Sequence, residues 1–267
     1  MLLREVEYAK PASVADALSL LAANDGARAL AGGQTLINVM KARAASPDVL
    51  VDLNGLDDLK GIELAGDGTL TIGAMTTYTE VMESAEAKAR PILAEVVGTI
   101  ADVQVRNRGT VGGNVCANDP TNHLPPLMTA IGARFHIVGA GGDREVSAEE
   151  FFLGVYMTAV APGELLTKIT IPAGKGDGFA AITLGVDGTC ICNAAASMNG
   201  SLRVALGCVD AVPVLLEPAS ADEGAVRDAV RAAGIDPPSD VHASAEYRLH
   251  LAEVLAVRAA RQAQGRT

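Results

Sequence analysis

Two pairs of adjacent glycines, each next to a predicted helix, constrain the fold of this chain more than any other feature. Gly32-Gly33 end a short strand-like run over 28–31, and Leu36, Val39 and Met40 then resume helical spacing. Glycine has no Cβ, so backbone amides beside it can approach an anion closely, and a helix that starts there adds its positive end. This pattern of strand, glycine turn and helix suits a phosphate group.

The second pair, Gly112-Gly113, is followed by NHLPPLMTAIGA, where we expect a helix with Pro125 and Pro126 near its start. Polar side chains accompany both pairs, since Gln34 and Thr35 follow the first, and Thr110 and Asn114 flank the second. Together the two segments could hold a pyrophosphate without a basic residue. A glycine pair can also mark only a turn, as we expect for Gly141-Gly142, and Thr35 and Asn114 can simply cap a helix or fill a turn.

The remaining pattern alternates strands and helices, and it predicts a domain boundary near residue 175. Strands are expected at 49–53 and 164–172, and AGKGDG at 173–178 is typical of a linker. The other expected elements are hairpins around 66–68, 141–142 and 199–200 and helices at 13–24, 77–84, 91–100, 221–233 and 243–263.

Composition excludes several classes of protein. The 267 residues carry 21 Lys+Arg and 32 Asp+Glu, for a net charge of −11, and 49% are hydrophobic although aromatics make up only 3%. Such a chain folds around small aliphatic side chains and is not disordered. It has no basic cluster to hold nucleic acid or anionic lipid, and no apolar run of the ~20 residues that cross a membrane. We expect a cytoplasmic protein without an export signal or membrane insertion.

Motifs for other chemistries are missing from the sequence. It contains no GxGxxG, GxxxxGK[ST], GxSxG or HExxH motif and no paired CxxC. Cys190 and Cys192 are close enough to share a strand face, but no further ligand lies near them in the sequence, so we interpret them as small core residues. The four cysteines are expected to be reduced thiols. We predict no metal site and no catalytic side chain in this chain.

Several segments together resemble the FAD-binding medium subunit of molybdenum hydroxylases, the carbon monoxide dehydrogenase and xanthine dehydrogenase family. The resemblance runs in order from the first residues to about 260, through AGGQTLINVMKAR, DLNGLDDLKGI, TIGAMTTYTEVMES, IADVQVRNRGTVGGNV and ASAEYRLHLAEVLAVRA. It implies an α+β, FAD-binding fold of the vanillyl-alcohol-oxidase or p-cresol-methylhydroxylase type. Two α+β subdomains, about 1–57 and 58–175, would form the FAD-binding domain 1–175, and 176–267 would form a C-terminal α+β domain of the carbon monoxide dehydrogenase flavoprotein type.

The resemblance also implies which residues hold a non-covalent FAD. The first flavin segment would be Ala31, Gly32, Gly33, Gln34, Thr35 and Leu36, and the second Thr110, Val111, Gly112, Gly113 and Asn114. Ile100 corresponds to an apolar position near the adenine, and Leu166 to one near the flavin. Asp187 matches an acidic position close to the isoalloxazine, although it can also only cap a turn.

The chain departs from the family pattern in two places. His123 stands where relatives usually have an Asp suited to ribose hydroxyls, so it is either a changed cofactor contact or a solvated surface residue. In the stretch 184–190 the usual basic pair before the Asp is absent, so the flavin face would be less covered. Cys116 lies beside the second segment, where a covalent flavin link is conceivable, but a buried small residue is the favoured interpretation.

The function implied is electron transfer within a larger assembly. A large molybdopterin subunit would oxidise the substrate, two [2Fe-2S] clusters of a small iron-sulfur subunit would pass electrons singly, and FAD on this chain would deliver them to a terminal acceptor. The family expectation is an (αβγ)2 assembly. Two alternatives stay open: a stand-alone flavin-dependent oxidase or reductase of the same superfamily, and a flavin-free scaffold subunit.

Overall fold

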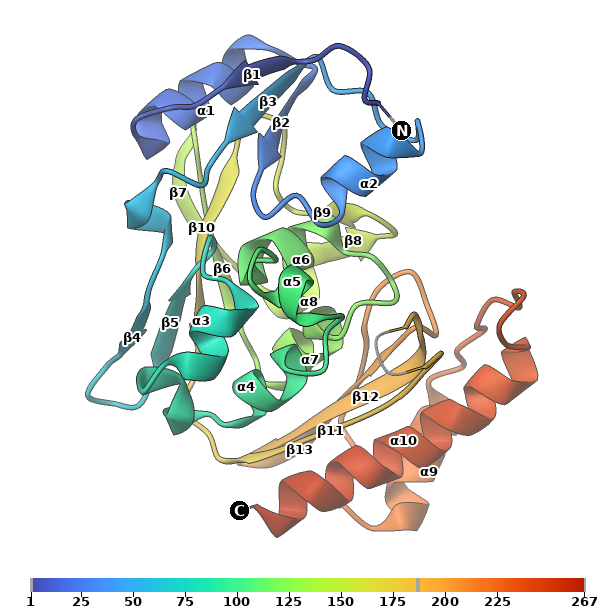
Figure 1. Cartoon of the computed structure of the whole chain (residues 1–267). Coiled ribbons are helices and arrows are strands. Elements are labelled where there is room, and N and C mark those ends of the chain that lie inside the picture. Colours follow the sequence, from blue (N-terminus) through green and yellow to red (C-terminus); the bar gives the residue numbers. More distant parts are fainter. Residues whose placement is uncertain (1, 186–187, 267) are drawn as a thin grey trace.

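The chain adopts an α+β fold in which helices cover three larger sheets and a two-stranded ribbon (Figure 1). The structure is a computed structural model, and it describes residues 2–185 and 188–266. The α+β class expected from the resemblance is confirmed. Within the described residues, none of the helices has the length and apolarity needed to cross a membrane.

The first sheet is parallel and has its own small core. Its strand order is β1 (Glu7–Ala9), β3 (Val49–Asp52) and β2 (Ala27–Leu30). All four residues of the central strand β3 are buried, as a strand covered on both faces requires. Helix α1 (Val14–Ala23) buries Ala17 and Leu21 in this core, and its N-cap Ser13 accepts a hydrogen bond from the Asp16 amide. Helix α2 (Leu36–Lys41) follows β2.

The second sheet is antiparallel. Its strand order is β4 (Ile62–Leu64), β5 (Leu70–Gly73), β10 (Leu165–Ile171), β6 (Arg134–Gly139) and β7 (Gly142–Ser147). Helix α6 (Val111–Ala117) packs on β10, and helix α7 (Leu124–Ala130) lies between this sheet and the third one with all seven residues buried. The other short elements around this sheet are η1 (Asp57–Leu59), α3 (Tyr78–Glu83), η2 (Glu86–Ala89), α4 (Ile92–Val97), α5 (Val103–Arg106), α8 (Ala148–Phe151), β8 (Phe152–Gly154) and β9 (Met157–Thr158).

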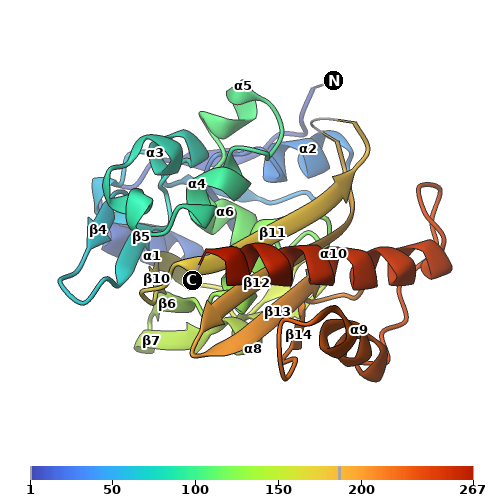
Figure 2. The same cartoon turned by 90° about the horizontal axis from the view of Figure 1, so that it is seen from below.

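The third sheet belongs to the C-terminal part of the chain. Its antiparallel order is β11 (Gly176–Thr183), β12 (Cys190–Asn199), β13 (Ser201–Gly207) and β14 (Val214–Leu216). The long helix α10 (Ala245–Gly265) lies along one face of β11 and β12, and α9 (Glu223–Ala232) packs beside it (Figure 2). Ala194 and Ala196 face this helix, whereas Ala195 and Ala205 face the core of the second sheet. Small side chains on both faces of the third sheet allow this close layering.

A buried arginine connects the second and third sheets. Arg90, next to η2, is 2% exposed and donates 2.8 Å hydrogen bonds from Nε and Nη2 to the two carboxylate oxygens of Asp177 on β11. Its Nη2 also donates to Ser197 Oγ on β12 at 3.1 Å, and its Nη1 donates to Pro172 O. This bidentate ion pair therefore holds the third sheet against the rest of the chain.

Three local expectations need correction. The linker at 173–178 is shorter than expected, because β11 begins at Gly176 and its residue Asp177 pairs with Arg90. Strands β1 and β11 were not expected at all. Helix α6 was also missed, and it contains the second glycine pair, which was expected in a loop before a helix. The domain boundary near 175 stays a prediction; the chain changes sheet between β10 and β11.

Candidate functional site

The first glycine segment forms an open turn between β2 and α2, as expected. Gly33 has a φ of +75°, a conformation that glycine adopts without strain. Gln34 Nε2 donates to Gly32 O at 3.2 Å, which closes the turn. Within the described part of the chain, the backbone amides of residues 32–35 have no hydrogen-bond partner. These amides are therefore available as hydrogen-bond donors to a ligand.

Asn54 holds the start of this turn in place. Its Nδ2 donates to Ala31 O at 3.0 Å and to Asp52 Oδ1 at 2.6 Å. Asp52 also accepts a hydrogen bond from the Tyr8 hydroxyl. Burial raises the pKa of Asp52, but the hydrogen bonds from Tyr8 and Asn54 outweigh it and keep that pKa below its usual value. Asp52 is therefore an ionised acceptor that orients Asn54 from the end of β3.

The second glycine segment is the first turn of α6 and not a loop. Thr110 is the N-cap, and its Oγ1 accepts from the Gly113 amide at 3.0 Å. The Val111 amide donates to Thr76 O and the Gly112 amide to Ala74 O, each at 2.9 Å. The expectation that both segments present free amides is therefore wrong for the second one, whose amides are used inside the chain.

The glycines of both segments allow backbone to approach backbone. A Cβ on Gly32 would lie 1.9 Å from Arg108 O, and one on Gly112 would lie 2.6 Å from both Ala74 O and Ala74 Cβ. A Cβ on Gly113 would lie 2.7 Å from Thr110 Oγ1 and 3.4 Å from Ala31 Cβ. The structure thus brings together the two segments that the sequence singled out, although about 80 residues separate them along the chain.

Asn114 and Tyr78 lie next to the place where the two glycine segments meet. Asn114 is 9% exposed, its Nδ2 donates to Tyr78 Oη at 2.9 Å, and its Oδ1 has no hydrogen-bond partner within the described residues. The Tyr78 ring packs so closely on Gly109 that a Cβ there would lie 2.8 Å from Cε2. Burial raises the pKa of Tyr78 to about 12, so its hydroxyl is neutral. Asn114, which follows the glycine packed near Ala31, therefore carries a buried acceptor that no described residue uses.

Two further side chains of this site were not predicted. Tyr78 gave no signal, because its contacts with Gly109 and Asn114 exist only in the folded chain. Asn54 could have been found, since it is a polar residue two positions after a buried strand.

The apolar positions carried over from the family lie in the core of the second sheet. Leu166 is buried on β10, next to an irregularity in its pairing with β6. Ile100 is half-buried against the same core, and its carbonyl accepts from Arg106 Nη1 at 3.0 Å. Ala101, which follows it, has a φ of +46°. No contact among those described joins either side chain to the glycine segments.

Of the two polar positions carried over from the family, the structure describes His123 but not Asp187. His123 is buried at 7% exposure, so its interpretation as a solvated surface residue is wrong. Its Nδ1 lies 3.2 Å from Asn193 Nδ2, and its ring is 5.2 Å from that of Phe179, so it packs on the third sheet. Asp187 lies outside the described residues.

The described cavities lie elsewhere. The larger one, of about 210 Å³, is lined by the N-terminal segment and by residues that follow α2, among them Arg4, Met40 and Arg43. The smaller one, of about 10 Å³, is lined by Asn118, Pro126 and Cys208 among others.

Comparison with known proteins places this arrangement in a family. Residues 4–174 match the model described as the FAD binding domain in molybdopterin dehydrogenase. The carbon monoxide dehydrogenase medium chain of Afipia carboxidovorans is 37% identical over 97% of both chains. The nicotine 6-hydroxylase medium subunit of Paenarthrobacter nicotinovorans is 34% identical over the whole of both. A chain of reconstituted CO dehydrogenase from Oligotropha carboxidovorans superposes over all of both chains with a TM-score of 0.93 and 37% identity.

Proposed function

Because the chain belongs to the family of FAD-binding medium subunits of molybdenum hydroxylases, we propose that it binds one FAD non-covalently and passes electrons from a partner subunit to a terminal acceptor. As a member of that family it is an oxidoreductase component. The electron donors proposed are two [2Fe-2S] clusters of a small subunit, and a large molybdopterin subunit would hold the substrate.

One observation carries the proposal of the binding site. Among the residues that the structure describes, none accepts a hydrogen bond from the backbone amides of residues 32–35, and this turn lies against the chain at Arg108 and Gly109 with no room for a Cβ at Gly32. A group of amides that no chain acceptor uses is the kind of concavity that binds phosphate oxygens. We assign the pyrophosphate of FAD to this turn, which consists of Ala31, Gly32, Gly33, Gln34, Thr35 and Leu36.

The second segment would serve the cofactor differently. Its amides are used within the chain, so the groups that remain for a ligand are side chains: the Thr110 hydroxyl and the unpaired Oδ1 of Asn114. A buried acceptor without a donor costs about 1–3 kcal/mol. A hydroxyl of the ribityl chain would supply the missing donor to Asn114 Oδ1. Val111, Gly112 and Gly113 would hold these side chains at the edge of the site by keeping α6 close to Ala74.

The chain's own part in the reaction would be binding and orientation. Bound FAD would supply the redox chemistry, which accepts electrons one or two at a time. Apart from the carboxylate of Asp52, which accepts from Tyr8 and Asn54, the side chains described around the glycine segments carry amides, hydroxyls and aliphatic groups. Their contribution would be dipoles and exclusion of water. Leu166 and Ile100 would pack against the two ends of the cofactor, with His123 and Asp187 near its ribose and its flavin ring.

The cofactor content of the complex purified from its native host tests this function. The spectrum is recorded, the protein is denatured, and flavin, iron and molybdenum are counted for each copy of this chain. One FAD released without a covalent bond, with about four irons and one molybdenum from co-purifying subunits, is the expected result. A chain that purifies alone with flavin and oxidises an organic substrate would contradict the electron-transfer role, and a chain without flavin would contradict the binding role as well.

A further inference from the structure

Two cysteines that the proposed flavin role does not use lie together where the third sheet meets α7. Cys190 is the first residue of β12, and Cys208 directly follows β13. Their side chains are buried, at 2% and 5% exposure. All four cysteines of the chain are free thiols.

The geometry of β12 places both sulfurs on the same side of the sheet. Asn193 pairs with Gly207 of β13, and it shares a face with Ala195, which points toward the core of the second sheet. The pairing of β11 with β12 shifts between Ile182 and Thr183, so Cys190 turns to the Asn193 side. Asn193 Nδ2 consequently lies 3.4 Å from Cys190 Sγ and 3.7 Å from Cys208 Sγ.

Cys192 provides an internal contrast, because it lies on the opposite face. Its Sγ is 4.0 Å from Arg248 O on α10, and the residue belongs to the core between the third sheet and that helix. Burial raises the pKa of Cys192 to about 12. It is therefore an inert thiol two residues away from Cys190.

The contact between the two sulfurs makes it easier for the pair to lose one proton than it would be for two isolated thiols. A hydrogen bond from the Cys208 thiol lowers the pKa of Cys190 against the effect of burial, and His123 and Asn193 add to this lowering. The same contact raises the pKa of Cys208. When Cys190 is neutral, its proton can point to Ile182 O, 3.6 Å away. A thiolate held beside a thiol is the arrangement that reacts with small oxidants.

A small cavity reaches one residue of this pair, Cys208. Cys208 lines the cavity of about 10 Å³ together with Pro126 and Asp210, and this volume corresponds to about one water molecule. Cys208 also has a φ of +66°, a backbone conformation that residues other than glycine rarely adopt. The strained residue is thus the one that an oxidant of near-water size would meet first.

We propose that Cys190 and Cys208 are a redox-active dithiol that hydrogen peroxide, or a peroxide of similar size, converts into a disulfide. The thiolate attacks one peroxide oxygen, the O–O bond breaks, and hydroxide leaves while a sulfenic acid forms on that sulfur. The second sulfur then attacks the first, the S–S bond forms, and the S–O bond breaks with loss of a second hydroxide. The first hydroxide takes the proton of the second thiol, and the second hydroxide takes the proton that the first thiol released when it ionised, so the sum is two thiols and one peroxide to one disulfide and two waters.

Peptide mapping of the intact complex tests this dithiol. The complex is treated with a small excess of hydrogen peroxide, quenched, denatured and alkylated, and the thiols of this chain are counted before and after reduction with dithiothreitol. We expect two of the four thiols to be lost, a linked peptide that joins Cys190 to Cys208, and full recovery on reduction. Four alkylated thiols after treatment, or a linked peptide that contains Cys192 instead, would overturn the proposal.

Two single cysteine variants test the same link in parallel with the wild type. In Cys192→Ala the Cys190–Cys208 link should still form, because Cys192 faces α10. In Cys208→Ala no link should form, and the Cys190 thiol should be lost more slowly than in the wild type, because the hydrogen bond from the Cys208 thiol is gone. A folded Cys208→Ala protein in which Cys190 is oxidised as fast as in the wild type would contradict a dithiol in which one sulfur activates the other.

Discussion

Gly112 illustrates how one missing methyl group sets the shape of the site. Its amide donates to Ala74 O, and a Cβ there would lie within 2.6 Å of Ala74 O and Ala74 Cβ. Even alanine would therefore push α6 away from the end of β5. Gly66, by contrast, has open space around the position of its missing Cβ.

We expect Gly112→Ala to lower the free energy of unfolding by about 1–3 kcal/mol, the cost of overpacking a tight contact. Gly66→Ala, the control, should change it by less than about 0.5 kcal/mol. Urea unfolding followed by circular dichroism measures both. Equal stabilities for the two variants would show that α6 does not depend on this contact.

Tyr78 acts on the site through Asn114. Replacing it with phenylalanine removes the hydroxyl that accepts from Asn114 Nδ2 and keeps the ring against Gly109. Since a single hydrogen bond contributes about 1 kcal/mol, we expect Tyr78→Phe to weaken FAD binding about fivefold. Tyr247→Phe is the matched control, because that residue is exposed on α10. Unchanged FAD affinity in Tyr78→Phe would show that the Tyr78 hydroxyl does not contribute to FAD binding.

Individual residues also show what the sequence could predict. The first glycine turn was predictable, because its strand, glycines and helix are consecutive in the chain. The used amides of α6 and the burial of His123 were not, because their partners, Ala74 and Asn193, lie 38 and 70 residues away. Such partners carry no local signal.

Among the elements, β11 depends on a charge that another part of the chain supplies. Asp177 is 2% exposed and pairs with Arg90, whose side chain is equally buried. Removing one partner of such a pair leaves an uncompensated buried charge. The strand was not predicted from its sequence, since glycines and a charged residue at its start are typical of a loop.

We expect Asp177→Asn to lower the free energy of unfolding by about 3–5 kcal/mol, since it leaves the Arg90 guanidinium without a carboxylate. Asp25→Asn, at an exposed position, should have an effect below about 0.5 kcal/mol. Thermal and urea unfolding of both variants provide the measurement. A small effect in Asp177→Asn would mean that water reaches Arg90 and that the two sheets are joined by other contacts.

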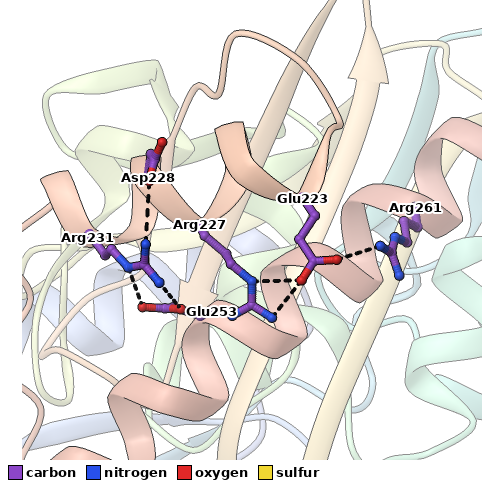
Figure 3. A network of polar contacts seen from close by, with 6 residues as sticks. All are labelled: Glu223, Arg227, Asp228, Arg231, Glu253 and Arg261. Atoms are coloured by element: carbon purple, nitrogen blue, oxygen red, sulfur yellow. Dashed lines mark hydrogen bonds and ion pairs between the residues drawn. The ribbon is translucent and has the colours of Figure 1, made fainter.

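Helices α9 and α10 are joined by a network of ion pairs at the surface (Figure 3). Glu253 on α10 accepts from Arg231 Nε at 2.9 Å and from Arg227 Nη1 at 2.8 Å. Hydrogen bonds from Arg231 and then Arg227 lower the pKa of Glu253. A carboxylate with a lowered folded-state pKa stabilises the fold above its unfolded pKa and ceases to do so as pH falls through the folded value.

The stability difference between wild type and Glu253→Gln should therefore be largest at neutral pH and low salt. Because these groups are near the surface, we expect less than about 1 kcal/mol. The difference should decline as pH falls below the ordinary glutamate pKa and vanish once pH is below the lowered pKa of Glu253 in the folded chain, and it should shrink in 1 M salt. Unfolding curves at several pH and salt values test this, and a difference that grows in acid would contradict a lowered pKa for Glu253 in the folded chain.

At the scale of the whole molecule, the resemblance predicted the α+β class and the family. It could not supply the contacts between distant segments that position the glycine turn against α6. The domain boundary near 175 was expected from a Gly-rich stretch, and the sheets do change between β10 and β11. Whether the parts fold separately stays a prediction, because α7 packs on the third sheet and also shares the core of the second sheet.

The most direct test of the proposed site is a titration of the flavin-stripped full chain with FAD and, in parallel, with riboflavin, followed by flavin fluorescence. If the amides of residues 32–35 bind the pyrophosphate, FAD should bind one per chain and about 100-fold or more tighter than riboflavin, or about 2.7 kcal/mol. In Gly32→Ala, whose Cβ would collide with Arg108 O, most of that preference should be lost. Equal affinity for the two flavins, or no binding of either to the folded wild-type chain, would contradict the assignment.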